Sequence, residues 1–328
     1  MAVVIGLVSV NIINPGNSIS DQTREELLIA YSDNADDKIS AANNQKNAGP
    51  LQPLIDLVPS NIVSATGDNR NMLQVIFFAI LFGISMILIP SKKSKPVKDF
   101  FDSFNEVILK IIDLIMLAAP YGVFALLAAL VVEAPSLDLF KALGLYGLTV
   151  LFGLLIMICI YIVLVKVLTG KSPSYFLKGI SPAQLLAFST SSSAATLPVT
   201  MERVQDHLDV DEEVSSFVLP IGATINMDGT SLYQAVAAVF IAQAFGMELS
   251  LYAQLGIVTT ATLASIGSAA VPGAGMVMLV IVLAQAGIPE AGLALIFAID
   301  RPLDMCRTVV NVTGDATVSM LVNKYRKK

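Results

Sequence analysis

The chain has 328 residues, of which 55% are hydrophobic and 14% are charged, whereas an ordinary soluble domain is about 45–50% apolar and about 25% charged. With a mean hydropathy of +0.73, this composition excludes a typical soluble domain and indicates a membrane protein. A net charge of −6, two cysteines and one histidine argue against nucleic-acid binding, a disulfide framework and most His-dependent metal or hydrolase chemistry.

The chain begins with an apolar segment, residues 1–13. It is too short to span a bilayer, because a spanning helix needs about 20 apolar residues. It also lacks the basic residues that begin a signal peptide. We therefore interpret it as the end of a helix whose beginning is absent from this chain, with a cleaved signal peptide as the alternative.

Three later stretches contain no charged residue and are separated by charged loops. They are residues 72–90, 114–132 and 142–165. Each is long enough to cross the hydrocarbon core as a helix, so the sequence predicts three simple spans.

The distribution of Lys and Arg predicts the orientation of these spans. Basic residues cluster at 91–98, 166–178 and 324–328, and such clusters are typical of the cytoplasmic side. The polar segment 17–49 is then predicted to lie outside the cell.

Two further charge-free regions, 179–201 and 249–289, are interrupted by Pro, Ser and Gly. Their interruptions resemble each other, because Ser192–Pro198 and Gly267–Pro272 both place small residues and a proline inside an apolar run. Paired, broken hydrophobic segments are typical of transporter binding sites, where irregular backbone lines a cavity. Close helix packing through small residues is the alternative.

The last apolar segment, roughly 291–323, contains a polar stripe. Its residues follow one another at steps of four, three, four and four, which places them on one helix face: Asp300, Asp304, Arg307, Asn311 and Asp315. An ionised side chain at the bilayer centre costs about 2.5–3.5 kcal/mol on insertion scales. The stripe is therefore predicted to face protein, water or a ligand. A surface helix, the alternative, would carry many Lys and Glu residues.

A second polar cluster, residues 226–230, interrupts another apolar run. Gly229 allows the backbone to leave the helix there, and the freed carbonyls would be hard oxygen ligands. Beside Asn226, Asp228, Asn311 and Asp315 they form an oxygen-only environment that suits a hard cation. The composition does not distinguish Na⁺ from H⁺ coupling.

Four segments carry a resemblance to a known family. They are SSSAATLPVTM (191–201), LPIGATINMDGT (219–230), LASIGSAAVPGAG (263–275) and DMCRTVVNVTGDA (304–316). With them the chain resembles, from residue 1 to its C-terminus, the glutamate transporter family of dicarboxylate/amino acid:cation symporters.

The resemblance implies an all-α membrane protein, a multi-span helical transporter with two re-entrant helical hairpins and inverted repeats. It implies a homotrimer in the lipid bilayer, in which a mobile transport domain moves like an elevator against a scaffold. The implied parts are a remnant of a third transmembrane helix (1–13), an extracellular polar loop (14–49), scaffold and trimerisation helices (50–130) and a transport domain (136–328). Within the transport domain it implies hairpin 1 (173–201, tip 191–195), a helix (213–243), hairpin 2 (252–286, tip 265–275) and a last helix (289–323).

The resemblance also implies roles for individual residues. Asp304 would bind the substrate ammonium and Arg307 its side-chain carboxylate. The other substrate-binding residues would be Ser192, Ser193, Thr230, Gly275, Thr308 and Asn311. Three sodium sites are implied: Gly222, Asn226, Asn311 and Asp315; Thr224, Ser265, Ile266 and Ser268; and Asn226 with Asp228.

The sequence departs from the family pattern in two ways. The first two helices and most of the third are missing, and the missing third helix normally supplies ligands to the third cation site. Some prokaryotic relatives carry an arginine in the first hairpin tip, where this chain has Ser191; Arg301 is a candidate substitute.

These observations predict a sodium-coupled symporter for aspartate or glutamate in the cell (inner or plasma) membrane, with several spans. It would not be an enzyme and would need no cofactor. Proton coupling, and a C4-dicarboxylate or neutral amino acid substrate, are alternatives within the family. An intramembrane aspartyl protease using Asp228 and Asp315 is disfavoured because a GxGD motif is missing. A channel or regulatory protein that binds solute without moving it also remains open.

Overall fold

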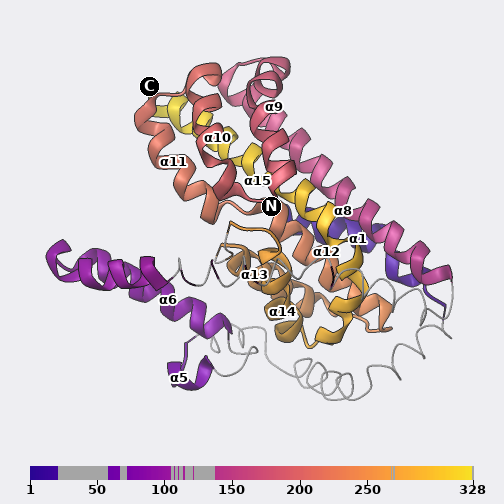
Figure 1. The fold of residues 1–328 in the computed structure, drawn as a ribbon. Coiled ribbons are helices and arrows are strands. Elements are labelled where there is room, and N and C mark those ends of the chain that lie inside the picture. The colour runs from indigo at the N-terminus through magenta and orange to yellow at the C-terminus, as the bar shows by residue number, and fades with distance from the viewer. Residues whose placement is uncertain are drawn as a thin grey trace. The chain divides into compact units, whose positions relative to one another are not determined.

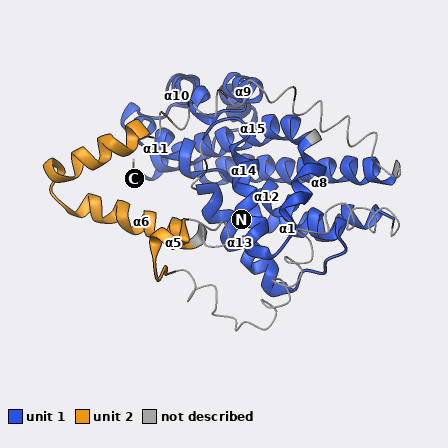
Figure 2. Cartoon of the chain, turned by 60° about the horizontal axis from the view of Figure 1, so that its bottom comes forward, with its two compact units in different colours: residues 1–47, 135–328 blue, residues 48–134 orange. Residues whose placement is uncertain are grey.

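A computed structural model describes residues 1–20, 58–66, 72–104, 137–266, 268 and 270–326, with single positions 107, 110, 114 and 121. All regular structure in these ranges is helical, which confirms the predicted all-α fold. The chain divides into two compact units, residues 1–47 with 135–328, and residues 48–134 (Figure 2).

The described part of the second unit is short. It contains α5 (Ile62–Ala65), which begins where the Asn61 side chain accepts from two backbone N–H groups, and α6 (Met72–Leu88). Helix α6 covers the predicted span 72–90. The predicted span 114–132 lies outside the described residues except for positions 114 and 121, and so does part of the proposed scaffold range 50–130.

The first unit is built on two apolar helices, α1 (Ala2–Ile13) and α8 (Leu137–Leu164). Helix α8 covers the predicted span 142–165 and continues as a π-helical turn, η3 (Val165–Thr169). Among the described helices, α8 with η3 is the one long and apolar enough to cross a membrane. Helix α1, followed by the short η1 (Pro15–Ser18), packs against α8 and α12 (Figure 1).

Two helical hairpins stand where the sequence predicts interruptions. In the first, α9 (Pro173–Thr190) and α10 (Ser193–Leu208) pack against each other and are joined by Ser191 and Ser192. Ser191 makes the turn with a left-handed backbone, φ 52°. In the second, α13 (Leu251–Ile266) packs on α14 (Ala274–Ala286). The first hairpin extends past the predicted end at residue 201, whereas the second matches 252–286 closely.

The segment 213–243, predicted as one helix, is two helices. Helix α11 (Glu212–Ile225) stops at Asn226, and α12 (Asp228–Ala244) starts after Met227. The ψ angles of Asn226 and Met227 are 70° and 51°, outside the helical range. The backbone therefore leaves the helix at these two residues rather than at Gly229. Gly229 lies inside α12, where a Cβ would be 2.5 Å from the Arg307 carbonyl oxygen.

Helix α15 (Leu293–Arg326), preceded by the short η4 (Glu290–Gly292), connects the parts of the first unit. It packs against α8, both helices of the first hairpin, α11 and α12. Nearly every residue of α12 is buried. Residues of α9, α10, α11 and α15 form an apolar core around Phe176 and Leu219. The polar stripe of α15 is therefore enclosed by helices.

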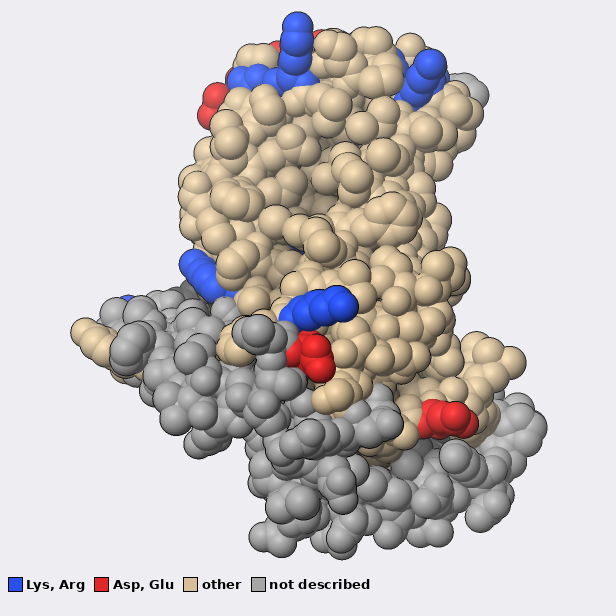
Figure 3. Space-filling view, turned by 90° about the vertical axis from the view of Figure 1, so that its right-hand side faces the viewer, with Lys and Arg blue, Asp and Glu red and all other residues tan. Residues whose placement is uncertain are grey.

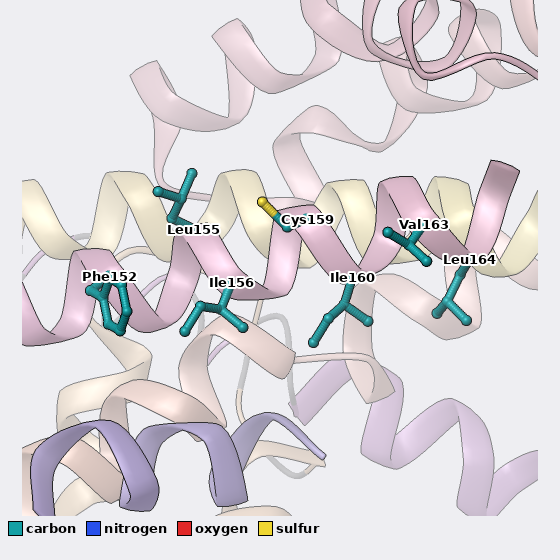
Figure 4. A pocket seen from close by; sticks show the side chains of 7 residues that line it. All are labelled: Phe152, Leu155, Ile156, Cys159, Ile160, Val163 and Leu164. Atoms are coloured by element: carbon teal, nitrogen blue, oxygen red, sulfur yellow. The ribbon is translucent and has the colours of Figure 1, made fainter. Parts of the chain in front are cut away.

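The outer surface is apolar along α8. A groove of about 460 Å³ lies on this helix (Figure 4) and is lined by Phe152, Leu155, Ile156, Cys159, Ile160, Val163 and Leu164. On the face shown in Figure 3, charged side chains gather toward the two ends, with a broad uncharged surface between them. This pattern is that of a protein surrounded by lipid.

Lys171 and Asp209 form an ion pair beyond the end of α8, where Lys171 precedes α9 and Asp209 follows α10. Lys171 Nζ lies 2.7 Å from Asp209 Oδ2, and the Tyr175 hydroxyl donates to the same oxygen at 2.7 Å. The hydrogen bond to Asp209 raises the pKa of Lys171. Both ends of the ion pair are largely exposed, so it adds little to stability.

Candidate functional site

The five residues of the α15 stripe are all buried. Their exposed fractions are between 1% and 8%, for Asp300, Asp304, Arg307, Asn311 and Asp315. The stripe therefore faces protein, as the spacing predicts. A buried charge is costly unless it is paired, so the partners of each group decide what the stripe can do.

Arg307 is the centre of the upper half of the stripe. Its Nη2 lies 2.7 Å from Asp304 Oδ1 and 3.3 Å from Asp300 Oδ1. Its Cζ lies 3.7 Å from the centre of the Tyr233 ring, a distance typical of a cation–π contact. Nε and Nη1 are buried and have no hydrogen-bond partner among the described residues. The guanidinium is thus held on one side and has donors left for an anionic ligand.

The two carboxylates that contact Arg307 have different surroundings. Asp304 Oδ2 accepts from the backbone N–H of Gly273 at 2.9 Å, so it faces the loop of the second hairpin. Asp300 lies beside Tyr233 on α12. Arg301 is half exposed, and its Nη1 lies 3.8 Å from Asp304 Oδ2.

The second hairpin and the middle of α12 approach Arg307 at Gly275. A Cβ at Gly275 would lie 3.3 Å from Arg307 Nη1 and 3.0 Å from Thr230 Cγ2. Asn311 donates to Thr230 Oγ1 at 3.3 Å and accepts from the Gly229 backbone at 2.8 Å. Four predicted substrate residues, Gly275, Thr230, Asn311 and Arg307, are therefore neighbours.

The tip of the first hairpin meets the loop of the second. The Ser192 hydroxyl donates to the Ala270 carbonyl at 2.6 Å and accepts from the Ala195 backbone at 3.1 Å, which caps α10. Ser193 is also buried. Thr308 donates to the Asp304 carbonyl within α15. The loop of the second hairpin therefore contacts both the stripe, through Gly273 and Asp304, and the tip of the first hairpin, through Ala270 and Ser192. Among the described residues, no hydrogen bond joins Ser193 to the stripe.

We expect Ser192→Ala to weaken the contact between the two hairpins. The change removes a buried hydrogen bond between them and an N-cap, each worth about 1 kcal/mol, so the free energy of unfolding should fall by about 2 kcal/mol. Thermal unfolding of the purified protein in detergent tests this, with Ser181→Ala on α9 as the matched control. An unchanged unfolding transition in the Ser192 variant would mean that the contact between the tips adds nothing to stability.

A second polar group lies in the lower half of the stripe. Asn226 donates to Asp315 Oδ1 at 2.9 Å. A Cβ at Gly222 would lie 2.5 Å from the same oxygen. Because glycine has no Cβ, the Asp315 carboxylate can lie directly against α11. The Tyr161 hydroxyl of α8 donates to Asp228 Oδ2 at 2.5 Å. We name these residues, Gly222, Asn226, Asp228, Asn311 and Asp315 together with Tyr161, the cation cluster.

The donor set of the cation cluster fits a hard monovalent cation. It consists of two carboxylates, two amides, a hydroxyl and the carbonyls freed at the break between α11 and α12, and oxygen ligands of this kind suit Na⁺. No group of three or more His, Cys, Asp or Glu side chains that could hold a metal ion occurs within the described ranges.

The other predicted sodium site is less well assembled. Thr224 is exposed and its hydroxyl donates to the Ile221 carbonyl, while Ser265 donates to the Thr262 carbonyl. Ile266 is 37% exposed, and Ser268 donates its N–H to Ser265. Ser265, Ile266 and Ser268 lie together at the end of α13, but among the described residues no hydrogen bond joins them to Thr224.

The sequence analysis did not select two tyrosines that the structure places at the site. Tyr233 lies three residues after Thr230 and stacks on Arg307, and Tyr161 comes from α8. Both hydroxyls stand in apolar, charge-free segments, where a polar group needs a partner. That feature of the sequence could have indicated them.

Comparison with known proteins agrees with these features. Residues 1–325 match the model of the sodium:dicarboxylate symporter family. The chain is 44% identical over 268 residues to excitatory amino acid transporter 3 of Oryctolagus cuniculus, covering 81% of this chain and 51% of that protein. It is 42% identical over 275 residues to an excitatory amino acid transporter of Caenorhabditis elegans, covering 83% and 54%. The chain thus spans about half the length of these relatives.

Proposed function

Because the chain belongs to the sodium:dicarboxylate symporter family, and is therefore a membrane protein, we propose that it is a sodium-coupled symporter of aspartate or glutamate. The observation that carries the proposal is the buried Arg307 with unpartnered Nε and Nη1 beside two carboxylates. A guanidinium pairs with a carboxylate, and a carboxylate pairs with an ammonium. One substrate with both charges, an acidic amino acid, satisfies both groups.

The proposed binding mode exchanges one ion pair for two. The substrate side-chain carboxylate would bind Arg307, and its ammonium would bind Asp304 in place of the guanidinium. Asn311, Thr308, Thr230, Gly275 and the hairpin tips at Ser192 and Ser193 would contact the rest of the substrate. A dicarboxylic acid without an amine would leave Asp304 against like charge, which disfavours it.

Sodium would travel as a second substrate. The cation cluster supports this proposal because its donors are oxygens and include two buried or half-buried carboxylates whose mutual repulsion a cation would relieve. The relatives are named as excitatory amino acid transporters, and this likeness supports an acidic substrate here. Proton coupling is the alternative that the test below separates.

Residues 136–328, which make up most of the first unit, would act as the moving transport domain. This assignment is supported by the presence of both helical hairpins and the whole polar stripe in that unit. Residues 50–130 would belong to the scaffold of a homotrimer in the inner or plasma membrane. Alternating access would then carry the site across the bilayer as one body.

Uptake of labelled aspartate into proteoliposomes tests the proposal. The full-length protein should accumulate aspartate with an inward sodium gradient, and unlabelled glutamate should compete whereas succinate and serine should compete weakly. Accumulation driven equally by a proton gradient without sodium would refute sodium coupling. Strong competition by succinate would refute the amino acid assignment, and binding without flux would favour a regulatory protein.

A further inference from the structure

Tyr161 reaches the cation cluster from α8. Its side chain is 4% exposed, and its hydroxyl donates to Asp228 Oδ2 at 2.5 Å. The residue lies in the charge-free part of α8. Its hydroxyl is therefore paired with a carboxylate of another helix, Asp228 at the start of α12.

Gly314 on α15 allows Tyr161 to approach Asn226. A Cβ built at Gly314 would lie 2.8 Å from Tyr161 Oη and 2.7 Å from Asn226 Nδ2. The two side chains thus lie against the same position of α15. Since Asn226 also donates to Asp315 and Tyr161 donates to Asp228, both hydrogen-bonded pairs meet at Gly314.

The direction of the hydrogen bond determines what Tyr161 can do. A donated O–H fixes the position of one carboxylate oxygen of Asp228. The other carboxylate oxygen and the lone pairs of the phenol oxygen remain available as acceptors. A hydrogen-bond partner that orients a ligand in this way typically changes metal affinity about 10–100-fold.

We propose that Tyr161 is a positioning residue of the sodium-binding cluster, which holds the Asp228 carboxylate toward Asn226 and Asp315 through its hydroxyl. The inference rests on the proposed function, because it concerns the cation that the symporter would carry. It adds a residue from α8 to a site whose other members lie on α11, α12 and α15. Helix α8 would thereby sense whether the cation is bound.

The test measures sodium binding without transport. The melting temperature of the purified full-length protein in detergent is followed while NaCl replaces choline chloride at constant ionic strength, and the sodium concentration at half of the stabilisation is recorded. In Tyr161→Phe, which loses only the hydroxyl, we expect this concentration to rise about tenfold. Tyr146→Phe is the matched control, because Tyr146 is also buried in α8 and its hydroxyl has no partner among the described residues.

A second variant approaches the same cluster from the other side. Gly314→Ala keeps every polar side chain but places a methyl group between Tyr161 and Asn226, so it should also raise the half-stabilising sodium concentration. A tyrosine that only ties α8 to α12 would lower the melting temperature equally in both salts and leave the half-stabilising concentration unchanged in Tyr161→Phe. That result, or tighter sodium binding, would overturn the inference. If sodium stabilises the wild type, the sodium site that the proposed function requires is present whichever way the variants behave; if it does not, the inference about Tyr161 and the proposed sodium coupling both fail.

Discussion

Replacing Arg307 with Cys should abolish transport of acidic amino acids. Arg307 is 1% exposed and is the buried cation between Asp300 and Asp304. Removing one partner of a buried, hydrogen-bonded charge pair costs about 3–5 kcal/mol, so kcat/KM for aspartate should fall about 100-fold or more. Uptake of neutral amino acids such as serine should be retained or increased, because their side chains need no guanidinium. Paired uptake assays with labelled aspartate and serine measure both effects.

Arg307→Cys leaves Asp300 and Asp304 buried without their cation. Double variants that also remove one of these carboxylates therefore serve as controls. Adding Asp300→Asn to Arg307→Cys should restore part of the lost thermal stability and neutral uptake, because it removes the excess negative charge. Adding Asp304→Asn should abolish neutral uptake, because the ammonium then has no partner. Lys178→Cys, which removes a positive charge from an exposed position on α9, should change aspartate uptake only slightly. Unchanged aspartate uptake in Arg307→Cys would contradict the assignment of the carboxylate-binding residue.

Replacing Asp315 with Asn should remove most of the sodium dependence. Asp315 is 3% exposed, accepts from Asn226 and lies against Gly222. The substitution keeps the size of the side chain but removes the negative charge that would attract a cation. Because hydrogen bonds and ligand contacts to charged groups are worth about 1.5–3 kcal/mol, the half-saturating sodium concentration should rise by about 10- to 100-fold. Sodium titration of aspartate uptake measures this.

The control for the Asp315 variant is Asp206→Asn, which removes the same charge from an exposed position on α10. It should leave the sodium titration in place. Should the Asp315 variant keep the wild-type sodium dependence, the cation cluster would not be a transport site, and sodium would have to bind elsewhere.

The sequence predicts the helices that carry strong periodicity or long apolar runs. The α15 stripe is predictable because residues spaced three or four apart lie on one face of a helix. A face with ionised side chains is too costly to expose to lipid, so it must face protein, water or a ligand. Helix α8 and both hairpins are predictable because charge-free runs with Ser and Pro interruptions are rare outside membrane proteins.

What the sequence did not predict depends on contacts between distant segments. The break at Asn226 and Met227 was expected at Gly229, since glycine is the residue that most easily leaves a helix; the structure instead uses Gly229 for close approach to α15. The roles of Tyr161 and Tyr233 require partners 67 and 74 residues away (Asp228 and Arg307). Spacing within one helix carries no information about such pairs.

The Arg307 group and the cation cluster lie on one face of α15, and we expect them to bind substrate and sodium as one unit. Simultaneous measurement of labelled aspartate and ²²Na⁺ entering the same proteoliposomes tests this most directly. Both fluxes should saturate together, and both should be lost in Arg307→Cys and reduced in Asp315→Asn. Aspartate accumulation unaccompanied by sodium entry, or sodium entry that ignores aspartate, would contradict it.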